Sequence, residues 1–289
     1  MTRVYLDAWP EVTIVNEPLD SGKAQVAATY NAASEHFDDS PLAFWDKYGR
    51  RTIERLSLAA GSSVLDVGCG SGASALPAAE AVGPSGQVIG VDLAEKLLNL
   101  GRAKAVERGL HNVEFRVGDM TDLGFADSRF DAVVSVFSIF FVEDMEEQVA
   151  ELWRIVCPGG RLAITTWGPR LFEPAESAWW EAVKRERPDL YSTDKPWNRI
   201  IDPDSLRQLL VDGGVPDAEV IAEEGRHLFE RPEDWWMVVL GSGYRGTMEK
   251  MTSEAAERVR KENIRWAKET ALTSIETNVI YAVATKYKP

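Results

Sequence analysis

Short β-branched runs alternate with helical stretches between about residue 60 and residue 168 of the chain. The β-branched runs predict strands at 64–67, 88–91, 113–117, 132–136 and 161–166. Helical patterns lie between them, over about 73–81, 93–108 and 144–156. Strands that alternate with helices of this length are typical of a parallel sheet covered on both faces. The pattern therefore predicts an α/β core.

The last third of the chain has a less regular pattern. Asp202 and Pro203 predict the N-cap and first turn of a helix, which Gly213 ends. A strand is expected at 218–222, two or more helices over 231–270, and a final strand at 279–285. No repeat or low-complexity linker interrupts the sequence, so we expect one domain overall.

A glycine-rich turn, DVGCGSG at 66–72, lies directly between the first predicted strand and helix. Glycines let the backbone approach a ligand closely, and the following helix offers unpaired N–H groups. Gly68, Gly70 and Ala73 also satisfy the dinucleotide pattern G-x-G-x-x-A, which is weak by itself. An NAD-dependent oxidoreductase is therefore one alternative.

Three carboxylates favour a different ligand. Asp66 precedes the first glycine by two residues and would repel a diphosphate at this turn. Asp92 ends the second strand, 20 residues after Gly72, where an acid can accept hydrogen bonds from both ribose hydroxyls. Asp119 follows the third strand, where an adenine amino group would lie. An adenosine ligand with a cationic tail and no phosphate is S-adenosylmethionine.

Four motifs carry a family resemblance, in the order VLDVGCGSG, VIGVDLAEKLL, VGDMTDLGFADSRFDAVVS and LWRIVCPGGRL. Together they make the segment 64–167 resemble class I S-adenosylmethionine-dependent methyltransferases, especially quinone C-methyltransferases and natural-product tailoring enzymes. The resemblance implies a Rossmann-like α/β fold with a seven-stranded sheet, an antiparallel last strand and helical lid segments. We expect an N-terminal helical cap at 1–59, a cofactor-binding core at 60–168, and remaining strands with lid helices at 169–289.

The resemblance also implies which residues contact the cofactor. The glycine turn and Asp66 would hold the methionine part, and a Tyr-containing helix near the N-terminus would fold over it. The expected cofactor residues are Tyr30, Asp66, Gly68, Cys69, Gly70, Gly72, Asp92, Leu93, Leu97, Asp119, Met120 and Ser135.

Tryptophans concentrate outside the core and indicate the kind of acceptor. Of the 10 Trp, Trp153 and Trp167 lie in 60–168 and the other eight, including Trp9, lie in the flanking segments. Aromatic lids suit an apolar or aromatic methyl acceptor, although the same rings could serve lid packing alone. The acceptor-contacting candidates are Phe37, Trp45, Phe137, Phe140, Trp167 and Trp179.

A general base is less evident from the sequence. Many relatives carry a His pair where Phe140 and Phe141 stand, so that loop offers no base here. We consider His36 and His227 as base candidates and expect His111 to be solvated. Methyl transfer from a sulfonium depends mainly on alignment, so a missing base does not argue against activity.

Two further features concern the first helix and the cysteines. Pro77 lies inside the first helix of the core and is expected to kink or shorten it. Cys69 and Cys157 are too few for a disulfide framework or a four-cysteine zinc site, and we expect no metal. Both are interpreted as small buried apolar residues rather than nucleophiles.

The charge balance of 32 Lys+Arg against 46 Asp+Glu gives −14, which disfavours nucleic acid and anionic membranes as partners. The N-terminus lacks the apolar block of a signal peptide, and the longest uncharged run, 132–142, is half a membrane span. We therefore expect a cytoplasmic small-molecule methyltransferase, with a homodimer as one option. The alternatives are the oxidoreductase and a non-catalytic cofactor-binding protein.

Overall fold

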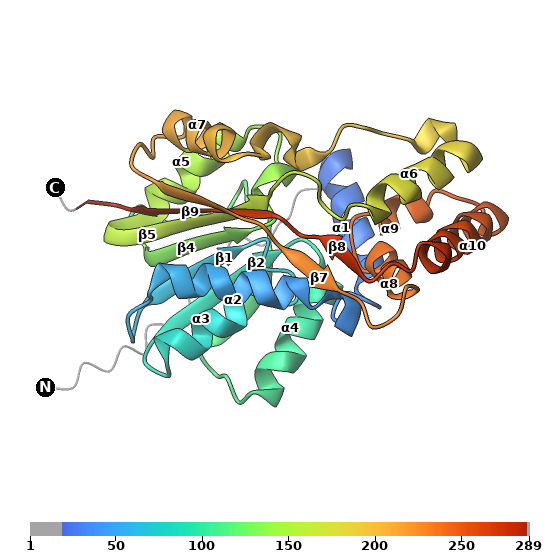
Figure 1. Ribbon diagram of the computed structural model, residues 1–289. Coiled ribbons are helices and arrows are strands. Elements are labelled where there is room, and N and C mark those ends of the chain that lie inside the picture. The colour runs from blue at the N-terminus through green and yellow to red at the C-terminus, as the bar shows by residue number, and fades with distance from the viewer. Residues whose placement is uncertain (1–18, 288–289) are drawn as a thin grey trace, which may run out of the picture.

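The computed structural model describes residues 19–287, and Trp9 lies outside this range. The main sheet has seven strands in the order β3-β2-β1-β4-β5-β9-β6. Figure 1 labels five of them, β1, β2, β4, β5 and β9. Strand β9 runs antiparallel to both neighbours, which confirms the predicted fold class. The strands are β1 Ser63–Val67, β2 Gln87–Asp92, β3 Val113–Val117, β4 Phe130–Val136, β5 Val156–Trp167, β6 Glu219–Glu223 and β9 Val279–Thr285. Strands β7 Arg226–Leu228 and β8 Ser274–Glu276 form a separate pair.

Helices cover both faces of the sheet (Figure 1). On one face lie α2 Phe44–Leu56, α3 Ala75–Val82 and α4 Glu95–Glu107, and on the other lie α5 Met145–Ile155 and α7 Pro203–Asp212. The side chain of Asp144 caps α5 by accepting a hydrogen bond from the Glu147 N–H at 2.8 Å. Asp202 caps α7 in the same way, with Pro203 as its first residue. Central strands buried on both faces explain the continuous apolar runs seen in the sequence.

The remaining helices gather beyond one end of the sheet (Figure 1). These lid helices are α1 Ser21–Ala33, α6 Ala175–Glu186, α8 Asp234–Leu240, α9 Arg245–Met248 and α10 Ser253–Glu269. Because β5 leads directly into the turn before α6, the lid lies at the carboxyl ends of the parallel strands. Within residues 19–287, no helix has the length and apolar character needed to cross a membrane.

Two local expectations about the core need correction. Strand β5 begins at Val156, directly after α5, and not at residue 161 as expected. Its pairing register with β4 shifts between Phe130 and Ala132. Helix α3 begins at Ala75, which makes Pro77 its third residue. The N–H groups on either side of it, those of Leu76 and Ala78, donate to the Gly72 and Ser74 carbonyl oxygens before the helix. Proline is tolerated in the first turn of a helix, so α3 need not be kinked at Pro77, although it is short at 8 residues.

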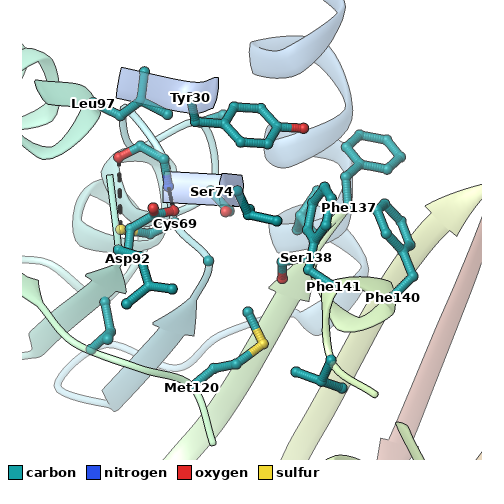
Figure 2. Close-up of a pocket in the computed structure, with 18 of the residues that line it drawn as sticks. Tyr30, Cys69, Ser74, Asp92, Leu97, Met120, Phe137, Ser138, Phe140 and Phe141 are labelled. Atoms are coloured by element: carbon teal, nitrogen blue, oxygen red, sulfur yellow. Dashed lines mark hydrogen bonds between the residues drawn. The ribbon is translucent and has the colours of Figure 1, made fainter. Parts of the chain in front are cut away.

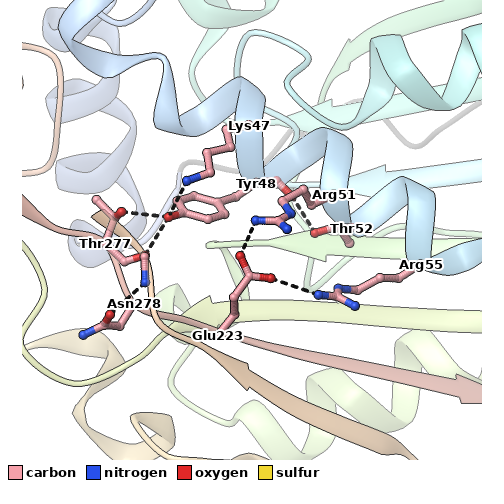
Figure 3. Close-up of polar contacts among 9 residues, drawn as sticks. Lys47, Tyr48, Arg51, Thr52, Arg55, Glu223, Thr277 and Asn278 are labelled. Atoms are coloured by element: carbon pink, nitrogen blue, oxygen red, sulfur yellow. Dashed lines mark hydrogen bonds and ion pairs between the residues drawn. The ribbon is translucent and has the colours of Figure 1, made fainter. Parts of the chain in front are cut away.

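Helix α2 is fastened to the sheet edge by polar contacts (Figure 3). The Tyr48 hydroxyl lies 2.8 Å from the carbonyl oxygen of Thr277 and 2.7 Å from its hydroxyl. Arg51 and Arg55 both form ion pairs with Glu223 of β6. These contacts join α2 to β6 and to the turn before β9, segments that are far apart in the sequence.

Replacing Tyr48 with phenylalanine should lower the free energy of unfolding by about 1–3 kcal/mol, because the buried polar groups of Thr277 lose their partner. Urea unfolding checks this, with Tyr287→Phe at an exposed position as the matched control. Equal stability of the two variants would contradict the assigned role of this contact.

Candidate active site

A cavity lies at the carboxyl ends of β1 to β4, beneath α1 and the aromatic residues that follow β4 (Figure 2). It contains about 1090 Å³ of empty space, including its opening to solvent. Ligands of open α/β sheets bind outside the carboxyl ends of the strands, so this position suits a binding site.

The glycine turn forms one wall of this cavity and is held from two sides. Gly68 has φ +67°, and a Cβ there would lie 2.3 Å from the Cβ of Ser138, so this position requires glycine. The Gly70 N–H donates to Oδ2 of Asp92 at 2.9 Å, while the Ala94 N–H donates to Oδ1 at 2.8 Å. The acid that ends β2 therefore fixes the shape of the turn after β1.

Two carboxylates at these strand ends lack a cationic partner. Asp66 is 1% exposed, and its Oδ1 has no hydrogen-bond partner, while its Oδ2 accepts from the Ser74 hydroxyl at 2.6 Å. Desolvation, with added repulsion from Asp92, raises the pKa of Asp66 to about 7. Desolvation also raises the pKa of Asp92. Within residues 19–287, neither acid forms an ion pair, so positive charge arriving here would stabilise both.

Asp119, which follows β3, has a different environment. Its Oδ2 lies 2.7 Å from Nζ of Lys23, which reaches down from α1, and the Thr121 N–H donates to its Oδ1. Burial opposes ionisation, but the Lys23 and Thr121 contacts outweigh it and lower the pKa of Asp119. This ion pair ties the lid helix α1 to the floor of the cavity.

Aromatic side chains form the opposite end of the cavity, away from Asp92 and Leu97 (Figure 2). Phe137, directly after β4, stacks on Trp167 with ring centroids 3.7 Å apart and planes 9° apart. Phe37 stacks on Trp45 with centroids 5.3 Å apart. These pairs come from four separate segments and make flat, rigid apolar walls.

The cavity brings together most of the residues expected from the sequence. Its lining includes Tyr30, Gly68, Cys69, Gly70, Asp92, Leu93, Leu97, Asp119 and Met120 from the cofactor set, and Phe37, Trp45, Phe137, Phe140 and Trp167 from the acceptor set. Asp66, Gly72 and Ser135 do not line the cavity themselves. Asp66 accepts a hydrogen bond from the Ser74 hydroxyl, and the Ser135 and Ser138 hydroxyls share one. Ser74 and Ser138 do line the cavity.

The structure does not bring the two base candidates to the cavity. His36 contacts Asp39, with Nδ1 2.9 Å from Oδ2, in the turn after α1. His227 lies on β7 against the rings of Phe44 and Phe229. Burial lowers the pKa of His227, which favours the neutral ring. Neither histidine is placed to take a proton from an acceptor in the cavity.

Two other expectations also need correction. Trp179 is fully buried in α6 and packs against Trp236 and Tyr244, so it serves lid packing instead of lining the cavity. Cys69 is buried as expected, but Cys157 is partly exposed, and its Sγ lies 2.9 Å from the Ser128 carbonyl oxygen.

Several lining residues were not anticipated from the sequence, namely Lys23, Val26, Ser74, Val136, Ser138, Phe141, Val142 and Trp197. Ser138 and Phe141 follow the end of β4, so their position along the chain could have indicated them. Lys23 and Trp197 reach the cavity only through the tertiary arrangement of the lid, for which the sequence pattern gives no signal.

Comparison with known proteins fits this geometry. Residues 65–164 match a family model described as a methyltransferase domain. This segment is a methyltransferase domain. It contains β1 to β4 and most of β5, together with the glycine turn and the three acids considered above.

Curated relatives of the methyltransferase domain act on small molecules, according to their names. The chain is 37% identical over 146 residues to aklanonic acid methyltransferase of Streptomyces sp. strain C5, which covers 50% of this chain and 66% of that protein. It is 38% identical over 129 residues to nocamycin O-methyltransferase of Saccharothrix syringae, covering 45% and 46%. It is 38% identical over 117 residues to demethylmenaquinone methyltransferase of Listeria monocytogenes, covering 40% and 49%. The matches thus span about half to two thirds of these relatives.

Solved structures share the fold. YcgJ of Bacillus subtilis has a TM-score of 0.55 and 17% identity, covering 84% of this chain and 100% of that one. Phosphoethanolamine N-methyltransferase 2 of Haemonchus contortus has a TM-score of 0.58 and 18% identity, covering 93% and 61%.

The raised pKa of Asp66 predicts a pH-dependent stability. The native state holds this proton more tightly than the unfolded chain, so its contribution to stability is present at acidic pH and is lost as pH rises from about 4 through about 7. Asp66→Asn should remove this loss. The variant should therefore gain about 2–3 kcal/mol relative to wild type between pH 5 and pH 8, measured by urea unfolding at both. A pH-independent difference would contradict the assignment.

Proposed function

We propose that this protein transfers a methyl group from S-adenosylmethionine to a small, apolar or aromatic acceptor. One observation carries the proposal: Asp66 and Asp92 are enclosed beside the glycine turn without a cationic partner within residues 19–287. A cationic adenosine ligand suits this site, because positive charge there lowers the cost of ionising both acids.

The residues present fit this cofactor. Asp92 would hold the ribose, Asp119 and Met120 would lie at the adenine, and the turn at Gly68 would face the methionine part. When bound, the cofactor supplies an electrophilic methyl group on a sulfonium. The chain then has to align the acceptor with that group and exclude water, which the stacked rings of Phe137 and Trp167 can do.

The names of the curated relatives support a small acceptor, and the aromatic end of the cavity supports a flat one. An NAD-dependent oxidoreductase is disfavoured, because its diphosphate would be repelled by the Asp92 carboxylate in the lining and by Asp66 behind it. The cytoplasmic location, the homodimer and the three-segment division of the chain stay predictions.

Wild-type protein should bind S-adenosylhomocysteine in isothermal titration calorimetry. Gly68→Ala should weaken binding at least about tenfold, because the added Cβ would collide with Ser138 and deform the turn. Gly109→Ala is the matched control: Gly109 has a similar φ of +65° but no atom near its Cβ position. It should bind like wild type.

Two results would count against the proposal. Absence of S-adenosylhomocysteine binding by folded wild-type protein would refute the cofactor. Equal weakening by Gly68→Ala and Gly109→Ala would show that backbone strain, rather than the fit of the turn, governs binding.

A further inference from the structure

Helix α1 presents one of its faces to the cavity. Lys23, Val26 and Tyr30 lie three and four positions apart on this helix, and all three line the cavity. Residues at this spacing share one face of a helix. Figure 2 shows Tyr30 across the cavity from Met120. The start of α1, with Lys23 and Val26, therefore closes one side of the cavity.

The two halves of α1 are held unequally. Residues 27–33 are anchored, because Thr29 is buried against Gly246 of α9. Residues 21–26 are half-buried or exposed. In the described part of the chain, the side-chain hydrogen bonds and ion pairs that join 21–26 to other elements are those of Lys23. Segments with few buried contacts open at low cost, so the first half of α1 is the half that can move.

The contacts of Lys23 form a small, partly exposed network. Its Nζ lies 2.7 Å from Oδ2 of Asp119 and donates to the Thr121 hydroxyl at 2.8 Å. Burial opposes ionisation of Lys23, but its contacts with Asp119 and Asp20 outweigh this and raise its pKa, so the ammonium stays charged at neutral pH. The Lys23 side chain is 28% exposed, so dissolved salt can screen the pair.

Lys23 also lies at the boundary between the cavity and an outer groove. This groove is lined by the start of α1, by the turn after β4 and by α5. Lys23, Phe141 and Val142 line both the groove and the cavity. Movement of residues 21–26 away from Asp119 would therefore join the cavity to the groove and to solvent.

We propose that residues 21–26 are a flap through which the cofactor enters and leaves, and that the ion pair between Lys23 and Asp119 is its latch. This inference rests on the proposed function. Lys23 is then a positioning residue: its pair with Asp119 breaks when the flap opens and forms again over the bound cofactor. A contact of equal strength in the free and bound states changes how often the flap opens but hardly changes the affinity.

The test measures exchange of S-adenosylhomocysteine by stopped flow, followed through tryptophan fluorescence, to which Trp45 in the cavity lining contributes. Lys23→Met removes the charge and keeps most of the side chain. It should raise the association and dissociation rate constants together, each by about threefold to tenfold, as expected for the loss of one partly exposed, hydrogen-bonded ion pair. The Kd from calorimetry should change by less than about twofold.

Salt gives a second readout, which a purely structural role of Lys23 would not produce. S-adenosylhomocysteine carries no net charge, so screening acts mainly on the protein. Between about 0.05 and 1 M NaCl the dissociation rate constant of wild type should rise, because salt weakens the latch. The rate constant of Lys23→Met should not change with salt.

Three further variants assign the effect to the latch. Thr121→Val removes the hydroxyl that Lys23 contacts, at a position outside the cavity lining, and should speed exchange in the same direction by a smaller factor. Asn31→Ala removes a hydrogen bond from the anchored half of α1 and should exchange like wild type. Lys268→Met removes a pair of the same 2.7 Å length, with Glu233, away from α1 and should do so as well.

The outcomes separate this inference from the proposed function. Failure of S-adenosylhomocysteine to bind folded wild-type protein would refute the cofactor itself. Three results would overturn the flap alone while binding persists. These are rate constants of Lys23→Met equal to those of wild type, faster dissociation with unchanged association, which is the behaviour of an ordinary ligand contact, and equal acceleration by Asn31→Ala, which would show that all of α1 opens.

Discussion

The placement of unpaired negative charge at the carboxyl ends of β1 and β2 governs the site. Asp66 and Asp92 lie there without a cationic side chain among the described residues, and the pKa of each is raised. Asp92 also fixes the glycine turn through the Gly70 N–H, so the same carboxylate shapes the wall and sets its charge. This arrangement is costly for the protein alone and becomes favourable when a cation binds. It therefore selects the sign of the ligand's charge as well as the ligand's position.

The lid complements this charged floor with an apolar roof. Helix α1 contributes Lys23, which neutralises Asp119, and Tyr30, which stays protonated. Trp45 and Trp167 extend the roof on the acceptor side. The cavity is thus divided: its acids lie at the carboxyl ends of β1, β2 and β3, and its rings lie beyond β4 and β5 (Figure 2). The proposed methyl transfer would use this division, because a cationic donor and an apolar acceptor must meet with water excluded.

Most of the core could be predicted from local signals in the sequence. Glycines at positive φ and acids that end strands are set by neighbours along the chain, so Gly68, Asp92 and Asp119 could be placed from the pattern alone. The lid could not be predicted in this way, because its residues meet only through tertiary packing. Trp179 is buried inside the lid, although an aromatic residue in this segment was expected to line the cavity. Lys23 contacts Asp119 from a position 119 − 23 = 96 residues earlier in the chain.

The most direct test is a crystal structure of the protein with S-adenosylhomocysteine. The account predicts ribose hydroxyls within hydrogen-bonding distance of the Asp92 carboxylate, with the amino acid part against the turn at Gly68 and the sulfur directed toward Phe137 and Trp45. A ligand bound elsewhere, or bound here with its sulfur directed away from these rings, would contradict the account.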